Sequence, residues 1–141
     1  MQDFKSVVEW GVMGLLLSLS AWAVAVALER WRFYRQVQVQ SYRSRVRLET
    51  ELTQRLGVIG SVAANAPYIG LLGTVLGIML TFEALGHSGA MDVKTIMVGL
   101  ALALKATAVG IGVAIPCVGL NNALRRVVRV KLAEFDEAQG G

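Results

Sequence analysis

A chain of 141 residues, of which 55% are hydrophobic and only 17% charged, departs from the composition of soluble globular domains. Its mean hydropathy of +0.55 agrees with this. The net charge of +4 would suit a nucleic-acid-binding protein, but the basic residues gather beside long apolar runs. We therefore predict a membrane protein without a nucleic-acid partner.

The first apolar run, residues 10–28, has no ionisable side chain and is long enough to cross a hydrocarbon core of about 30 Å. We expect a transmembrane helix over residues 8–30 and a helical segment over residues 31–56. A cleaved signal peptide is the alternative. Secretory signals normally begin with positive charge, whereas Asp3 and Glu9 precede this run, so the sequence favours a retained anchor.

The segment between the first two runs predicts a turn followed by one long helix. The turn is expected in QVQVQS, residues 36–41, with Ser41 as the N-cap of the helix that follows. From Tyr42 that helix continues without a break into the second apolar run, where we expect a transmembrane helix over residues 57–85. Its length would be about 45 residues, or nearly 70 Å.

The third apolar run, residues 95–124, is interrupted only by Lys105 and is expected to form the third transmembrane helix. A loop over residues 86–94 precedes it, and a tail over residues 125–141 follows it. Apolar residues recur at helical spacing from its end into this tail, at Leu124, Val128, Leu132 and Phe135. This stripe predicts that the helix continues beyond the membrane and packs against partner helices, with a frayed tail as the alternative.

The positive charges predict how the chain is oriented in the membrane. They cluster after the first run and after the third, at Arg30, Arg32, Arg35, Arg43, Arg45, Arg47, Arg55, Arg125, Arg126, Arg129 and Lys131. The N-terminal leader and the loop over residues 86–94 carry only Lys5 and Lys94. Because loops rich in Lys and Arg stay in the cytoplasm, we expect the N-terminus and this loop outside, and the 31–56 segment and the C-terminus in the cytoplasm.

The second and third runs are rich in small residues, among them Gly73, Gly77, Gly110 and Gly112. In a membrane such residues let helix backbones approach closely, so we predict a tightly packed helix pair. Local kinks are expected at Pro67 and Pro116, because each removes a backbone hydrogen bond. The single cysteine, Cys117, lies within the third run, so no disulfide framework is expected.

Thr74 and Thr107 fall at the same depth when the second and third helices are laid antiparallel about their centres. On a helical wheel Thr81 shares the face of Thr74, and Asn121 shares the face of Thr107. We therefore predict two small, partly hydroxylated faces that line one cavity. The alternative is that each threonine hydroxyl bonds the carbonyl four residues earlier in its own helix.

Lys105 lies about 200° from Thr107 around the same helix, so the two side chains leave it on nearly opposite sides. A charge near the middle of a bilayer costs about 2.5 to 3.5 kcal/mol. Glu83 is the nearest acid across the hairpin, but it lies about seven residues, roughly 10 Å, nearer the outside. Snorkelling, a contact between subunits and an acid from another protein remain alternatives for Lys105.

Two segments, NAPYIGLLGTVLGIMLTF and ALALKATAVGIGVAIP, closely resemble the ExbB branch of the ExbB, TolQ and MotA family of motor proteins. The resemblance implies a ring of five chains in the bacterial inner membrane, around the single transmembrane helices of two ExbD-like subunits. It also implies that inward proton flow is coupled to motion. The family's pore threonines map onto Thr74 and Thr107, whereas Leu102 stands where many relatives carry a glutamate. The titrating acid would then be an aspartate of the partner's helix.

These observations predict an all-α polytopic membrane protein with three transmembrane helices, acting with ExbD-like and TonB-like partners to energise outer-membrane import. A TolQ-like role in envelope maintenance and a non-conducting scaffold are the alternatives. An enzyme is not expected, because His87 stands alone and no nucleophile, base and acid come together. No metal or other cofactor is expected either, because no cysteine or histidine cluster has metal-ligand spacing.

Overall fold

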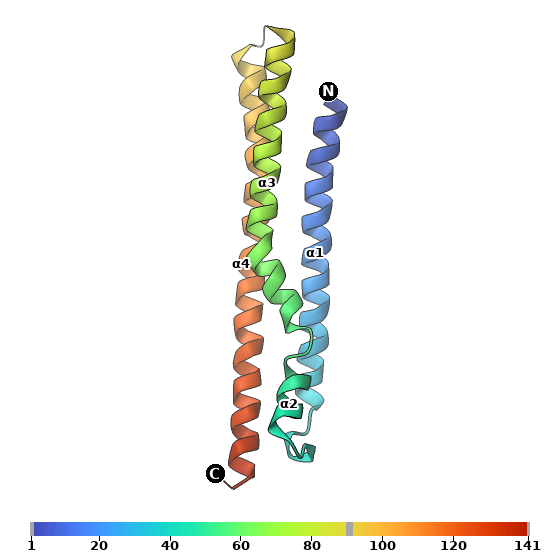
Figure 1. Cartoon of the computed structure of the whole chain (residues 1–141), viewed down its shortest axis with the longest axis vertical. Coiled ribbons are helices and arrows are strands. Elements are labelled where there is room, and N and C mark those ends of the chain that lie inside the picture. Colours follow the sequence, from blue (N-terminus) through green and yellow to red (C-terminus); the bar gives the residue numbers. More distant parts are fainter. Residues whose placement is uncertain (1, 90–91, 141) are drawn as a thin grey trace.

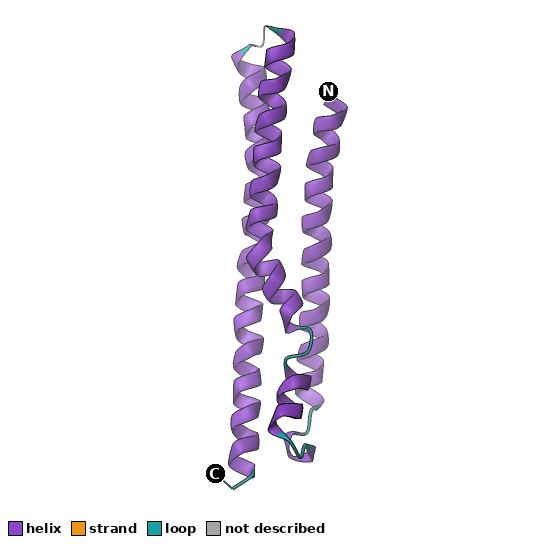
Figure 2. Ribbon diagram, viewed as in Figure 1, coloured by secondary structure: helices purple, strands orange, loops and turns teal. Residues whose placement is uncertain are grey.

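The computed structural model describes residues 2–89 and 92–140. Regular structure there is entirely helical, as Figure 2 shows, so the predicted all-α fold is confirmed for these residues. The elements are α1 (Gln2–Gln36), the 3-10 turn η1 (Val39–Ser41), α2 (Arg45–Leu52), α3 (Leu56–Ser88) and α4 (Val93–Ala138). Within the described residues, three stretches are long and apolar enough to cross a membrane, Ser6–Gln36, Leu56–His87 and Val93–Ala138.

The three long helices lie side by side, with α3 and α4 as an antiparallel hairpin and α1 packed along it (Figure 1). We call the end where α3 passes into α4 the hairpin end, and the end that holds α2 and the C-terminus the α2 end. Helix α1 does not reach the hairpin end and begins part of the way from it toward the α2 end (Figure 1). Pro67 and Pro116 interrupt neither helix, although Figure 1 shows the first turns of α3 leaning toward α1. Of the predicted loop over residues 86–94, residues 90–91 lie outside the described part.

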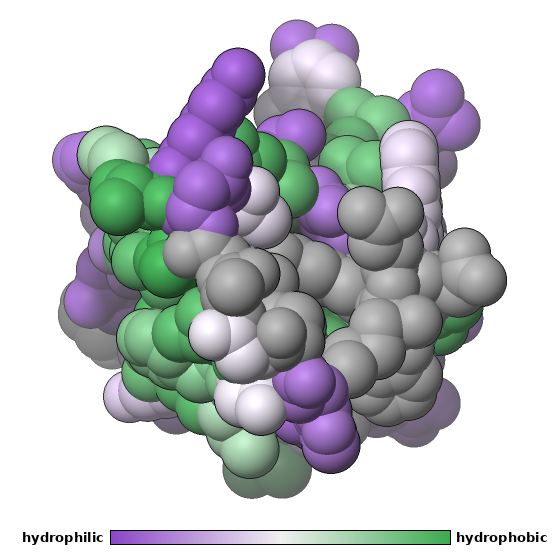
Figure 3. Space-filling model, turned by 90° about the horizontal axis from the view of Figure 1, so that it is seen from above, coloured by the Kyte–Doolittle hydropathy of each residue, from purple (hydrophilic) through white to green (hydrophobic). Residues whose placement is uncertain are grey.

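Large apolar side chains are exposed along all three long helices. Figure 3, seen from the hairpin end, shows apolar side chains at the surface between polar ones. Examples exposed by more than half are Trp10, Leu17, Met79 and Ile115. A soluble monomer rarely exposes so much apolar surface, so this surface is suited to lipid or to other membrane helices.

The prediction of one continuous helix from Tyr42 is wrong. Helix α2 ends at Leu52, and α3 begins at Leu56 after Arg55, whose φ of 67° is left-handed. A break at this point frees the carbonyls of Glu51 and Leu52 from helical pairing. Side chains of α1 replace the lost donors, because Arg30 Nη1 donates to the Glu51 carbonyl at 2.7 Å and the Tyr34 hydroxyl to the Leu52 carbonyl at 2.6 Å.

Ser41 does not cap a helix as expected. Its hydroxyl donates to the Gln38 carbonyl within the 3-10 turn, at 2.7 Å. Ser44 is the N-cap of α2, and its hydroxyl accepts a hydrogen bond from the Arg47 N–H. The turn expected in QVQVQS therefore extends to residue 44, because Tyr42 is still in extended backbone.

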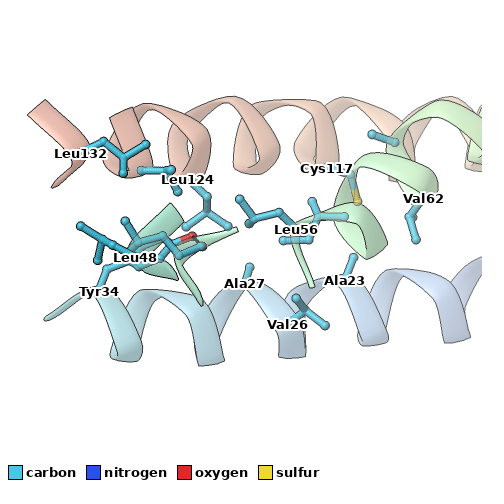
Figure 4. Packing of buried hydrophobic residues seen from close by; sticks show 14 of the residues in the cluster. Ala23, Val26, Ala27, Tyr34, Leu48, Leu56, Val62, Cys117, Leu124 and Leu132 are labelled. Atoms are coloured by element: carbon cyan, nitrogen blue, oxygen red, sulfur yellow. Dashed lines mark hydrogen bonds between the residues drawn. The ribbon is translucent and has the colours of Figure 1, made fainter. Parts of the chain in front are cut away.

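The α2 end holds the larger apolar core. Figure 4 shows Leu48 of α2 and Leu56 of α3 between α1 and α4, where Ala23 and Ala27 leave room for them on α1. The stripe predicted in the tail is buried in this core, and it comprises Leu124, Val128, Leu132 and Phe135. The helix continues to Ala138, so the expectation of packing is confirmed and the alternative of a frayed tail is wrong for the described residues.

Replacing Tyr34 by phenylalanine is expected to lower the melting temperature of the protein in detergent. The Tyr34 side chain is 3% exposed, and loss of its hydroxyl leaves the Leu52 carbonyl without this donor. The free energy of unfolding should fall by about 1–2 kcal/mol. Tyr68→Phe is the matched control, because Tyr68 is 67% exposed. Equal melting temperatures for the two variants would show that the hydrogen bond from Tyr34 does not stabilise the break between α2 and α3.

Candidate functional site

Helices α3 and α4 touch through their backbones at Gly70 and Gly110. A Cβ atom at Gly70 would lie 2.5 Å from the Ala106 carbonyl oxygen. The converse holds at Gly110, where a Cβ atom would lie 2.5 Å from the Ala66 carbonyl oxygen. Only glycine fits such a contact, so these two positions set the spacing of the hairpin.

The predicted close packing of small residues is confirmed along this contact. A Cβ atom at Gly73 would lie 2.9 Å from the Cβ of Ala106, and one at Gly77 would lie 2.8 Å from the Cβ of Ala103. Gly112 differs, because no atom lies within 4 Å of where its Cβ would be. Packing within the chain therefore explains the glycines of the hairpin contact and leaves Gly112 unexplained.

The hydroxyls of Thr74 and Thr107 contact each other across the hairpin. Thr74 is buried and donates to the Ala103 carbonyl of α4 at 2.7 Å. Thr107 is half-buried, and its hydroxyl also lies 3.4 Å from the Gly70 carbonyl of α3. The predicted common depth is confirmed. The alternative, a bond within the same helix, is wrong for these two residues because each reaches the opposite helix.

The other candidate residues do not join this pair. Thr81 is buried and donates to the Gly77 carbonyl in its own helix at 2.9 Å, as the alternative predicted. Asn121 lies toward the α2 end, where its side chain faces Gly60 and accepts a hydrogen bond from Arg125 Nε at 3.2 Å. It lies about 14 residues, or roughly 21 Å, along α4 from Thr107.

Lys105 is exposed and makes no ion pair with another residue of the described ranges. The Glu83 carboxylate, which was the nearest candidate acid, lies instead 3.8 Å from His87 Nε2. The stretched Glu83–Lys105 pair is therefore not formed within the chain. As expected, Lys105 is on the outside of the hairpin, while the Thr107 hydroxyl is turned toward α3.

Tyr42 and Asp92, which lie outside the three apolar stretches, have shifted pKa values. The Tyr42 hydroxyl donates to the Glu51 carboxylate, which raises the pKa of Tyr42. Asp92 is the N-cap of α4 and accepts from the Thr95 N–H at 3.0 Å. Hydrogen bonds from the side chain and backbone of Thr95 lower the pKa of Asp92. The hydrogen bond of Asp92 caps α4, and that of Tyr42 joins the turn before α2 to Glu51 of α2. Both lie away from the threonine pair.

The threonine pair can bind a proton carrier without holding a permanent charge. A hydroxyl both donates and accepts hydrogen bonds, so two of them beside two carbonyls can stabilise a carboxylate, a carboxylic acid or a short file of water. Within residues 2–89 and 92–140, no group of three His, Cys, Asp or Glu side chains could hold a metal ion. The threonine pair is therefore suited to hydrogen bonds with a proton-carrying group or with water.

One residue that lines a cavity beside the hairpin was not among the candidates from the sequence. Glu9 of α1 is half-buried and lines the cavity that α1 forms with Gly73 and Gly77 of α3 and Leu102 of α4. A signal was present, because Glu9 precedes Val12 and Leu16 by three and seven residues, and that spacing places all three on one helix face. Leu16 is fully buried and Val12 packs beside Gly73.

Three apolar helices with a paired hydroxyl contact between two of them define a polytopic membrane protein suited to moving protons. The chain belongs to the MotA/TolQ/ExbB proton channel family, whose sequence profile matches residues 24–137. Biopolymer transport protein ExbB of Aquifex aeolicus (strain VF5) is 51% identical over 140 residues, which cover 99% of this chain and 95% of that protein.

Two further relatives show how far the similarity extends. The putative biopolymer transport protein ExbB-like 2 of Helicobacter pylori (strain ATCC 700392 / 26695) is 46% identical over 132 residues, which cover 94% of this chain and 88% of the relative. The Tol-Pal system protein TolQ of Haemophilus influenzae is 42% identical over 85 residues, which cover 60% of this chain and 36% of the TolQ. Similarity to these two ExbB-type proteins therefore spans nearly both whole chains, while similarity to this TolQ is partial.

Proposed function

We propose that the chain is the proton-channel subunit of an ExbB-type motor that uses the proton motive force to energise TonB-dependent import across the outer membrane. The observation that carries this proposal is the contact between Thr74 and Thr107, because it joins the two family motifs across the hairpin. Near-complete coverage by the ExbB proteins supports the same assignment and favours it over a TolQ-like role.

The working form in this proposal is a ring of five copies in the bacterial inner membrane. The ring holds the transmembrane helices of two ExbD-like subunits and contacts a TonB-like protein. The exposed apolar side chains of the long helices support contacts with lipid and neighbouring copies. The basic residues around α2 and the last turns of α4 support a cytoplasmic α2 end, which leaves the N-terminus and the hairpin end in the periplasm.

In this mechanism the threonine hydroxyls stabilise both states of a titrating carboxyl group supplied by the partner's helix. A hydroxyl can donate to the carboxylate and accept from the carboxylic acid, so both protonation states keep a hydrogen-bond partner in the membrane. Each proton that crosses yields about 2.3 kcal/mol per 100 mV. One proton thus supplies only a few times the thermal energy, so we expect several protons to be coupled to each mechanical event.

Reconstitution tests this function directly. The chain is co-purified with a single-span ExbD-like partner and placed in vesicles that contain a pH-sensitive dye. An imposed membrane potential, negative inside, should acidify the lumen at a rate well above that of empty vesicles. A complex that assembles fully but conducts no protons would support the non-conducting scaffold instead, and recovery of the chain only by itself would contradict the proposed partnership.

A further inference from the structure

Glu9 places a carboxylate below the hairpin end, beside the apolar part of the hairpin. Its position along the helix axis follows from its neighbours, because it lines a cavity together with Leu102 and Ala103 of α4. Ala103 lies ten residues beyond the start of α4 at Val93, which corresponds to roughly 15 Å along the helix. Figure 1 agrees, because α1 begins well below the point where α3 passes into α4. Acidic side chains at such a depth are rare and are functional candidates.

The Glu9 side chain separates two cavities of different size and character. The outer cavity offers about 560 Å³ to water and has polar residues in its wall, Ser6, Lys94 and Thr95. The inner cavity offers only about 20 Å³ and is lined mainly by small and apolar residues. A single water molecule needs about 10–15 Å³ by this measure, so the inner cavity has room for one or two. Glu9 and Leu102 are the residues that line both cavities.

The inner cavity reaches the backbone that holds the threonine pair. Its wall includes Ala103, whose carbonyl accepts the hydrogen bond from Thr74 at 2.7 Å. It also includes Ala106, which immediately precedes Thr107 in α4. The outer cavity, the Glu9 carboxylate and the threonine contact therefore follow one another from the hairpin end toward the middle of the hairpin.

Two lysines belong to the surroundings of Glu9. Lys94 of α4 lines the outer cavity together with Glu9, and Lys5 precedes Glu9 by four residues in α1, which is one helical turn. The residues that α3 contributes to these cavities, Gly73 and Gly77, carry no charge. Among the side chains that the structure describes, which begin at Ser6, none forms an ion pair or hydrogen bond with Glu9. Glu9 lines the outer cavity, where its carboxylate can meet water.

We propose that Glu9 binds protons from the outer cavity and releases them toward Thr74 and Thr107, so that each subunit carries its own proton-collecting acid. This rests on the proposed proton-channel function and adds a residue to it. A carboxyl group at a boundary between water and an apolar space can take a proton on the wet side and carry it inward as a neutral acid. The neutral acid does not bring a charge into the apolar cavity.

Proton flux into vesicles tests the proposal with the complete complex. Glu9→Gln keeps the shape of the side chain but cannot exchange a proton, and it is expected to lower the flux at least tenfold while the complex elutes at its normal size. Glu9→Asp keeps the carboxyl group and should restore a clear part of the flux. Glu83→Gln is the matched control at the same end of the molecule and should conduct like the wild type. Wild-type flux in Glu9→Gln would overturn the proposal.

A chemical readout tests proton binding without relying on flux. Dicyclohexylcarbodiimide modifies protonated carboxyl groups in apolar surroundings, and peptide mass spectrometry should find it on Glu9 and not on the exposed Glu83. Failure to modify Glu9 would overturn the proposal. If Thr74→Val stops the flux and Glu9→Gln does not, only the role of Glu9 fails. If the assembled wild-type complex conducts no protons, the proposed function fails, and the labelling decides whether Glu9 binds protons.

Discussion

Replacing Thr74 or Thr107 by valine is expected to abolish proton flux through the complex and energised import in cells, while the complex still assembles. Valine has nearly the shape of threonine but can neither donate nor accept a hydrogen bond. The Ala103 carbonyl keeps its place in the α4 helix, so loss of the bond from Thr74 should cost only about 0.5–1.5 kcal/mol of stability. Flux into dye-loaded vesicles and size-exclusion chromatography measure the two effects separately.

Two further variants make this prediction specific to the hydroxyl contact. Thr74→Ser keeps the hydroxyl and should retain a substantial part of the flux. Thr50→Val removes a hydroxyl that donates to the Val46 carbonyl within α2, and it should leave the flux unchanged. Normal flux in both Thr74→Val and Thr107→Val would remove the threonine pair from the proposed path.

Replacing Gly110 by valine is expected to force α3 and α4 apart. The new Cβ atom would lie 2.5 Å from the Ala66 carbonyl oxygen and 3.0 Å from the Gly70 Cα, and neither backbone atom can move without moving its helix. The destabilisation should be about 3 kcal/mol or more, the upper part of the range for overpacking. A strongly reduced yield and a lower melting temperature of the protein in detergent would be the observed result.

Gly112→Val provides the matched control two residues away in the same helix. No atom lies within 4 Å of a Cβ atom at Gly112, so the monomer in detergent should keep its melting temperature. An equal loss of stability in the two variants would show that valine harms α4 by itself, and it would contradict the role given to the backbone contact. Gly70→Val should behave like Gly110→Val, because a Cβ atom there would lie 2.5 Å from the Ala106 carbonyl oxygen.

The threonine pair is a case in which counting along the sequence was sufficient. Two helices of similar apolar length, joined by a short loop, must lie antiparallel at a common depth, and this brings Thr74 level with Thr107. The sequence could not show that each hydroxyl reaches the opposite helix. That outcome depends on the backbone contact at Gly70 and Gly110, which brings Thr74 within 2.7 Å of the Ala103 carbonyl.

The break after α2 shows where local signals failed. No glycine or proline precedes Arg55 in this segment, and the leucines at 48, 52 and 56 suit a continuous helix. The break is stable because Arg30 and Tyr34 of α1 supply donors to the freed carbonyls. These partners lie 21 and 18 residues away in the chain, beyond the reach of a helical pattern.

Hydropathy and helical period determined from the sequence alone that the chain has three apolar spans, a buried stripe at the end of α4 and two threonines at one depth. These properties depend on residues close together in the chain or on the length of a helix. Only the tertiary structure decided where the long helix breaks and that Glu9 lies beside the hairpin. Those features depend on which side chains of α1 meet the backbone of the other helices, and packing between distant segments settles this.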